Sequence, residues 1–141
     1  MITSMKKQIL LLGVLLLWLS ACTINESTES ASVQHRVAAR DWVQNTDGDG
    51  LNLFFSCTMP VPELSNYVFQ HGLVQVYIVL NGAQQVLPYS RHYEDLDGNY
   101  WTQTIDYEFS QGSITYFVTH SDFFYTTADI STMDFRVQLW W

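Results

Sequence analysis

The strongest fold signal in the sequence is Leu73-Val74-Gln75-Val76-Tyr77-Ile78-Val79-Leu80-Asn81-Gly82. The first eight residues alternate with period two, which is typical of a strand with one buried face. That face carries Val74, Val76, Ile78 and Leu80. Asn81 and Gly82 both accept the positive φ angles of a two-residue hairpin turn. The stretch therefore predicts a strand that turns back and pairs with residues 84–87.

Similar short runs lie on both sides of this hairpin, rich in the aromatic and β-branched residues that favour strands. A short helix is expected over 66–71, because Ser65 is suited to cap it and Gly72 to end it. We expect an all-β fold, a single antiparallel β-sandwich of about seven to eight strands with one short crossover helix. A small closed barrel is the alternative. The further predicted strands cover residues 35–44, 51–59, 91–96, 100–109, 114–120 and 133–141.

The N-terminal residues have the layout of an export signal. Lys6 and Lys7 precede an apolar run over 9–19, which is shorter than the roughly 20 residues of a membrane span. The run ends in Leu19-Ser20-Ala21-Cys22, which looks like a bacterial lipobox. We therefore expect cleavage after residue 21 and lipidation of Cys22, with an ordinary secretory signal as the alternative.

Three segments follow from this layout. Residues 1–21 are the expected lipoprotein signal peptide, 22–32 a polar, flexible tether, and 33–141 the β-sandwich domain. A multiply acylated N-terminus is a lasting membrane anchor. The expected location is therefore the cell envelope, at the outer membrane, with the membrane as a partner through the N-terminal lipid.

Charge excludes one class of partner. The whole chain carries a formal charge of −8, and loss of Lys6 and Lys7 with the signal leaves −10. Such a surface repels phosphate backbones, so nucleic acid is not an expected partner.

The loop Asn45-Thr46-Asp47-Gly48-Asp49-Gly50 matches the first half of a calcium-binding loop. The twelfth position of such a loop is normally a glutamate, and here it is Ser56. We expect a polar hairpin turn, with calcium held by Asn45, Asp47 and Asp49 as the alternative. The acidic run over 94–98 has the same two interpretations, and no cofactor is expected.

Catalysis is not expected either. His120-Ser121-Asp122 contains the residue types of a hydrolase triad, but neighbouring residues on a strand point in opposite directions. No Gly-x-Ser-x-Gly elbow occurs in the sequence. The four histidines also lack the usual spacing of metal ligands. Cys57 lies on the apolar face of its predicted strand and is expected to be a buried core residue.

Aromatic side chains are the remaining candidates for binding. Trp101, Trp140, Tyr93 and Tyr100 lie on or beside predicted strands, and Trp140 alternates away from Trp141. Exposed aromatic rings stack on sugars or fill pockets in protein partners. The alternative is that these rings complete the core or cover the outer faces of the sheets.

The sequence contains Val61-Pro62-Glu63-Leu64 leading to Gly72 and Val74-Gln75-Val76-Tyr77, then Leu87-Pro88-Tyr89-Ser90-Arg91-His92, Trp101-Thr102-Gln103-Thr104-Ile105-Asp106-Tyr107 and Thr132-Met133-Asp134-Phe135-Arg136-Val137. These segments resemble a group of uncharacterised lipoproteins of Bacteroides-type bacteria. The resemblance covers residues 33–141 and implies a compact β-domain on a lipid anchor. The group has no established activity, so no functional residue is carried over.

Together these observations predict a lipid-anchored, non-catalytic binding or interaction module whose ligand is a glycan or a surface protein. A structural subunit is the alternative, in which the terminal strand Met133–Trp141 pairs as an edge with a neighbour's sheet. A small hydrolase is the third possibility.

Overall fold

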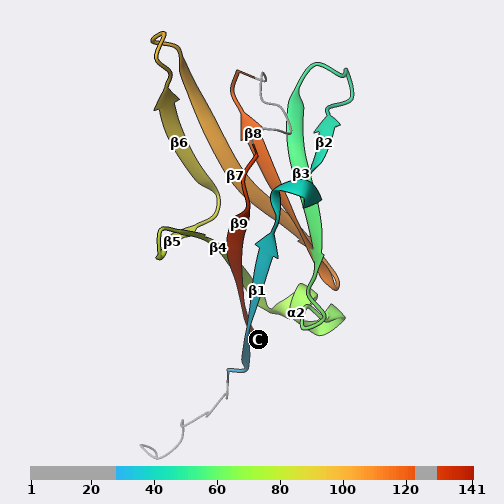
Figure 1. The fold of residues 1–141 in the computed structure, drawn as a ribbon. Coiled ribbons are helices and arrows are strands. Elements are labelled where there is room, and N and C mark those ends of the chain that lie inside the picture. Colours follow the sequence, from blue (N-terminus) through green and yellow to red (C-terminus); the bar gives the residue numbers. More distant parts are fainter. Residues whose placement is uncertain (1–27, 123–129) are drawn as a thin grey trace, which may run out of the picture.

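A computed structural model describes residues 28–122 and 130–141 of the 141-residue chain. The expected signal peptide, the Cys22 lipidation site and residues 22–27 of the expected tether lie outside the described residues. The described residues form nine strands in two antiparallel sheets, with one short α-helix (Figure 1). The sheets pack face to face, which confirms the predicted β-sandwich.

The smaller sheet has four strands in the order β1-β9-β4-β5. The predicted hairpin is present here, with Asn81 and Gly82 at positive φ between β4 and β5. The strands are β1 (Ser30–Val37), β9 (Met133–Trp140), β4 (Leu73–Leu80) and β5 (Ala83–Val86).

The larger sheet has five strands in the order β2-β3-β8-β7-β6. Its turns between β2 and β3 and between β6 and β7 lie at the same end of the molecule, at the top of Figure 1. The strands are β2 (Val43–Thr46), β3 (Leu53–Pro60), β8 (Ser113–His120), β7 (Tyr100–Ser110) and β6 (Tyr89–Glu94).

The core lies between the two sheets and is built by the alternation that the sequence shows. Val74, Val76 and Ile78 are buried as predicted, and so is Cys57. At the centre, Tyr116 of β8 stacks on Phe135 of β9, with ring centroids 4.0 Å apart. Aromatic stacking across the two layers therefore joins the sheets.

A buried histidine and a buried tyrosine form a polar contact between the two sheets. His35 of β1 is buried, and its Nδ1 lies 2.7 Å from the hydroxyl oxygen of Tyr116. Its Nε2 lies 3.1 Å from the carbonyl oxygen of Pro60, which can only accept a hydrogen bond. We therefore assign the proton to Nε2, so that Nδ1 accepts from the Tyr116 hydroxyl. Burial lowers the pKa of His35, against smaller raising effects of the Pro60 carbonyl and Glu63.

Helix α2 (Asn66–His71) lies beside the ends of β1 and β9, at the bottom of Figure 1. As predicted, Ser65 caps it, and its side-chain oxygen accepts from the backbone N–H of Val68 at 3.3 Å. At the other end, a Cβ on Gly72 would lie 2.9 Å from the carbonyl oxygen of Trp140. This close approach requires glycine and fixes the end of α2 against the end of β9.

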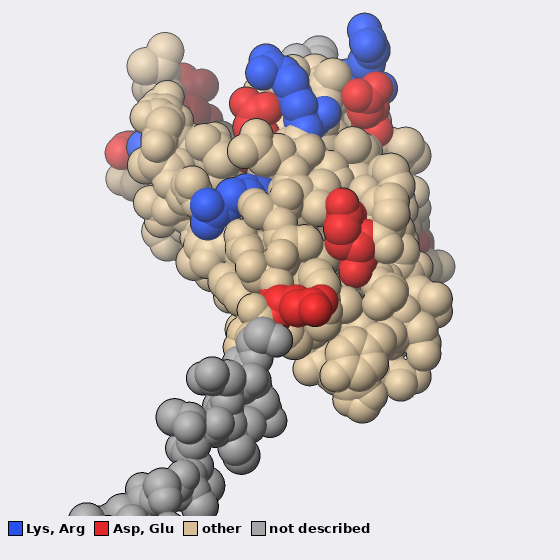
Figure 2. Space-filling view, turned by 90° about the horizontal axis from the view of Figure 1, so that it is seen from below, with Lys and Arg blue, Asp and Glu red and all other residues tan. Residues whose placement is uncertain are grey.

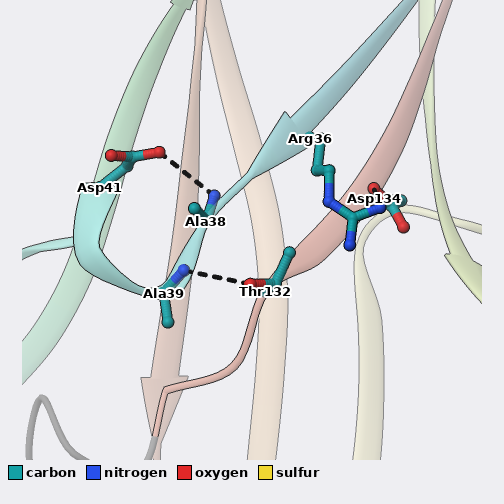
Figure 3. Close-up of polar contacts among 6 residues, drawn as sticks. All are labelled: Arg36, Ala38, Ala39, Asp41, Thr132 and Asp134. Atoms are coloured by element: carbon teal, nitrogen blue, oxygen red, sulfur yellow. Dashed lines mark hydrogen bonds and ion pairs between the residues drawn. The ribbon is translucent and has the colours of Figure 1, made fainter.

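The predicted first strand over 35–44 is wrong, because two strands occupy this region. A 3-10 turn, η1 (Ala39–Asp41), separates β1 from β2 and carries the chain from one sheet to the other. In Figure 3 the Asp41 carboxylate accepts from the N–H of Ala38, and the N–H of Ala39 donates to Thr132. β1 also begins at Ser30, so residues 30–32 belong to the sheet and not to the expected tether.

The terminal strand is not an edge strand, which corrects the basis of the structural-subunit alternative. β9 pairs with β1 on one side and with β4 on the other. Its backbone hydrogen-bonding groups are used within the four-stranded sheet. The sheet edges of the described residues are β1, β5, β2 and β6.

Within residues 28–122 and 130–141, no helix has the length and apolar character needed to cross a membrane.

Candidate functional site

The register of the four-stranded sheet brings polar side chains from four strands together on its outer face. Asp134 lies opposite Arg36 on β1 and opposite Val79 on β4, and Val79 lies opposite Gln84 on β5. The next row consists of Gln34, Arg136, Tyr77 and Val86. Because side chains two residues apart on a strand share a face, the two rows are adjacent on one surface.

These rows line a groove with a volume of about 590 Å³. The polar groups that border it are amides, guanidinium groups and a carboxylate. Such groups give a ligand both hydrogen-bond donors and acceptors. The outer-face residues that line it are Gln34, Arg36, Val79, Gln84, Asp134 and Arg136.

Arg136 is the most distinctive group in this groove. Its guanidinium carbon lies 4.7 Å from the centre of the Tyr77 ring, an arrangement in which the aromatic face attracts the cation. Within the described part of the chain, Arg136 has no acidic partner, and its Nε is shielded from solvent without a hydrogen bond. The terminal nitrogens are thus the groups through which Arg136 can meet a ligand.

Arg36 and Asp134 form the other charged pair of the groove. Arg36 Nη1 lies 3.6 Å from Asp134 Oδ1, and the two side chains face one another in Figure 3. Both are substantially exposed, so the pair is open to solvent and to a ligand. With Arg136, the groove contains two guanidinium groups and one carboxylate.

The four aromatic residues predicted as a binding site do not lie together in the structure. Tyr93 and Trp101 lie opposite each other on β6 and β7 and stack, with ring centroids 4.3 Å apart and an angle of 12°. Arg91 lies over Tyr93 at 5.5 Å, and His120 contacts Trp101 at 4.7 Å. Neighbouring groups therefore cover ring faces that a sugar would need for stacking.

Tyr100 and Trp140 do not join this stack. Tyr100 is exposed at the start of β7, and as the neighbour of Trp101 on the strand it points to the opposite sheet face. Trp140 lies at the end of β9 in the other sheet, opposite Ser30 and Leu73. As predicted, it points outward, on the face that also carries the groove.

In the two acidic turns, between β2 and β3 and between β6 and β7, aspartate carboxylates accept hydrogen bonds from backbone N–H groups of the same turn. The Asp47 carboxylate accepts from the N–H groups of Leu51 and Asn52, and Asp49 accepts from that of Leu51. Asn45 instead donates to Ser56 and to the carbonyl of Val43. The two carboxylates thus bond to the backbone of the turn, whereas the Asn45 amide nitrogen bonds to β2 and β3.

The turn between β6 and β7 is built in the same way. Asp95 accepts from the side-chain amide of Asn99 and from the N–H groups of Asn99 and Asp97. The bonds from Asn99 are the main reason that the pKa of Asp95 lies below its ordinary value. Across the described ranges, no group of three or more His, Cys, Asp or Glu side chains is placed to hold a metal ion.

Two residues of the triad-like sequence, His120 and Ser121, bond to β7. The His120 ring lies on the inner face, where its Nε2 is 2.9 Å from Nε2 of Gln103. The Ser121 hydroxyl oxygen accepts from the N–H of Thr102 at 2.9 Å. These contacts tie the end of β8 to β7.

The groove residues are not among the site residues predicted from the sequence. The alternation of β9 does place Asp134, Arg136 and Gln138 on one face, which is a usable signal. Their partners Gln34, Arg36 and Gln84 come from strands far away in the sequence, and only the register shows that they converge.

Comparison of the chain with protein-family models, curated proteins and solved structures finds no match.

Proposed function

We propose that this protein is a lipid-anchored, non-catalytic binding module of the bacterial cell envelope, held at the outer membrane through Cys22. The export-signal layout and the Leu19-Ser20-Ala21-Cys22 motif support the anchor. The polar groove on the outer face of the four-stranded sheet supports the binding role. In this proposal the groove replaces the Tyr93–Trp101 stack as the ligand site.

The observation that carries the binding role is Arg136. An arginine that lies against an aromatic ring, with no acidic partner among the described residues, is a ready-positioned donor for an anionic group. A side chain that is already ordered loses less conformational entropy when a ligand arrives. A carboxylate is the group that a guanidinium recognises best with paired hydrogen bonds.

The rest of the groove favours a glycan over a protein. Sugar hydroxyls both donate and accept, and Gln34, Gln84 and Asp134 offer matching groups. Protein interfaces depend on large anchors buried in pockets, and the groove has only Val79 as an apolar outer-face lining residue. The proposed ligand is therefore a carboxylate-bearing glycan.

The experiment is an array of neutral and carboxylated glycans probed with the purified full chain and two variants. Arg136→Gln removes one of the two groove arginines, the one that lies on Tyr77, whereas Arg40→Gln removes an exposed arginine that pairs with Asp41 outside the groove. We expect the first variant to weaken binding at least tenfold, or about 1.4 kcal/mol. The second variant should bind like the native chain, because the two changes alter net charge equally.

The outcomes separate the possibilities. Equal losses in the two variants would show that overall charge, not the groove, governs binding. Binding of no glycan would exclude the proposed ligand and leave a protein ligand for the module. Mass spectrometry that finds an unmodified Cys22 thiol in the mature protein would exclude the anchor.

A further inference from the structure

Four exposed apolar side chains lie on helix α2, directly after it, and at the end of β7. Tyr67 and Leu73 are 61% and 62% exposed, and Phe69 and Phe109 are also exposed. We call these four residues the α2 patch. Phe69 contacts Phe109 edge to face, with ring centroids 5.9 Å apart, so the helix and the end of β7 share one surface. Other large apolar side chains of the described residues are also exposed, including Leu51, Leu96 and Tyr100 at the opposite end, but the α2 patch is the group that lies at the end where the N-terminal segment enters the fold.

The α2 patch lies beside the point where the N-terminal segment enters the fold. Leu73 is opposite Trp140, and Trp140 is opposite Ser30, the first residue of β1. Glu29 exchanges two backbone hydrogen bonds with Trp141, at 2.8 and 3.0 Å. The Trp141 indole also donates to the Glu29 carboxylate at 3.0 Å. Residue 29 is thereby fixed next to the patch.

Chain length then limits how far this end can be from the membrane. Seven residue steps separate Cys22 from Glu29, and even a fully extended chain covers only about 25 Å over that distance. If lipid is attached at Cys22, the end of the molecule that carries the α2 patch stays within this range of the bilayer. The acidic turns of Asp47 and Asp95 are at the other end (Figure 1).

The charges at this end are compatible with contact to lipid headgroups that carry no net charge. Figure 2 views the molecule from below and shows mostly uncharged surface, with a few separated charged groups. The acids in or next to the segments that form this end are Glu29, Glu63 and Glu108. They give no attraction to anionic lipid. They also limit penetration to the headgroup level, where tyrosine and other aromatic side chains are favoured.

We propose that the α2 patch docks into the headgroup region of the bilayer that holds the N-terminal lipid, an inference that rests on the proposed anchor. Docking sets the orientation of the body. The strand axes stand away from the membrane, and the turns between β2 and β3 and between β6 and β7 point outward. The occupant of the patch is the lipid surface itself.

The test uses the full-length lipidated protein in phosphatidylcholine–phosphatidylethanolamine vesicles that contain brominated phosphatidylcholine. A fluorophore is attached to Tyr67→Cys in the patch or to Leu96→Cys, a fully exposed position in the turn between β6 and β7. Cys57 is buried and does not compete for the label. We expect several-fold stronger quenching at position 67 than at position 96.

A second change tests the patch itself. Leu73→Ser in the Tyr67→Cys background replaces an exposed side chain, so the fold is expected to persist, which circular dichroism checks. Quenching should fall towards the level of position 96, while the protein still floats with the vesicles. Adding phosphatidylglycerol should not strengthen quenching.

The possible failures are distinct. Protein that floats with the vesicles but shows equal, weak quenching at both positions would overturn docking and leave the anchor intact. Protein that does not float with the vesicles would overturn the anchor and docking together. Unchanged quenching in the Leu73→Ser chain would exclude the α2 patch as the contact surface.

Discussion

The outer faces of the two sheets satisfy their polar groups in different ways. On the five-stranded sheet, short side chains on paired strands bond to each other: Ser90 with Thr104, and Thr58 with Thr115. On the four-stranded sheet, the long side chain of Arg136 lies on Tyr77 and has no acidic partner within the described residues. On the first face these hydroxyl groups satisfy one another, whereas on the second the Arg136 guanidinium has no acidic partner among the described residues.

Side-chain length explains the difference. Directly opposed residues have Cβ atoms about 4.5–5.5 Å apart, a distance that two hydroxyl groups bridge. Arginine and glutamine extend beyond this distance and arrange around a groove. Asp106 is an exception on the five-stranded sheet, because burial, and then the charge of Glu108, raise its pKa. A charged side chain without an oppositely charged partner therefore indicates a candidate site better than the number of polar residues on a face does.

Among the stability predictions, we expect the greatest loss when the polar contact that joins the two sheets in the core is removed. Tyr116→Phe removes the hydroxyl that donates to His35 Nδ1 and leaves a buried acceptor without a partner. We expect a loss of about 1–3 kcal/mol in the free energy of unfolding. Urea denaturation followed by tryptophan fluorescence measures it.

Tyr107→Phe is the matched control for this substitution. Its hydroxyl donates to the carbonyl of Val74 at a longer distance of 3.2 Å, from a half-buried position. Its loss should therefore be smaller. An unchanged stability of Tyr116→Phe would show that the contact between His35 and Tyr116 does not stabilise the joined sheets.

A smaller effect tests the hydroxyl pairs of the five-stranded face. Thr115→Val leaves the Thr58 hydroxyl without its cross-strand partner, which is 2.9 Å away, and should cost about 0.5–1 kcal/mol. Adding Thr58→Val removes the other partner, and the double variant should regain most of that loss. A urea-denaturation cycle of the two single variants and the double variant measures the coupling. Purely additive losses would contradict the self-satisfied character of this face.

The smallest expected effect concerns pH. The pKa of His35 lies below its ordinary value of 6.5 in the folded protein, mainly because of burial. Between the two pKa values, His35 is therefore protonated in the unfolded chain and neutral in the folded chain. His35 lets the protein keep full stability above about pH 6.5 and lose stability as the pH falls from there to the folded pKa.

Urea midpoints between pH 8 and pH 5 measure this decline. His35→Gln removes the titrating group and should flatten the curve over this range, whatever its effect at pH 8. An equally steep decline in the variant would assign the pH dependence to other groups.

Local sequence predicted much of the fold. The alternation of β4 and the Asn81-Gly82 turn are confirmed, and so are the Ser65 cap and the burial of Cys57. These features depend on neighbouring residues, so the sequence contains their signal. The strand over 35–44 failed because its weak alternation hides the 3-10 turn at Ala39–Asp41.

The candidate site was far less predictable. Trp101 and Tyr93 attracted attention as aromatic residues, but their register makes them stack on one another. Arg136 was visible as an outward-facing residue of β9, and nothing in its local sequence shows that Tyr77 lies beneath it. The position of β9 inside its sheet also depends on partners about 60 and 100 residues earlier in the chain.

The positions of most strands and turns, and the apolar face of most strands, follow from local sequence alone, because period and turn chemistry act over a few residues. Only the tertiary structure decided which strands share a sheet, which strand lies at an edge, and which polar side chains meet. Strand pairing joins segments far apart in the chain, and a shift of one residue in register would exchange the faces of every side chain. The groove and the α2 patch are consequences of that pairing.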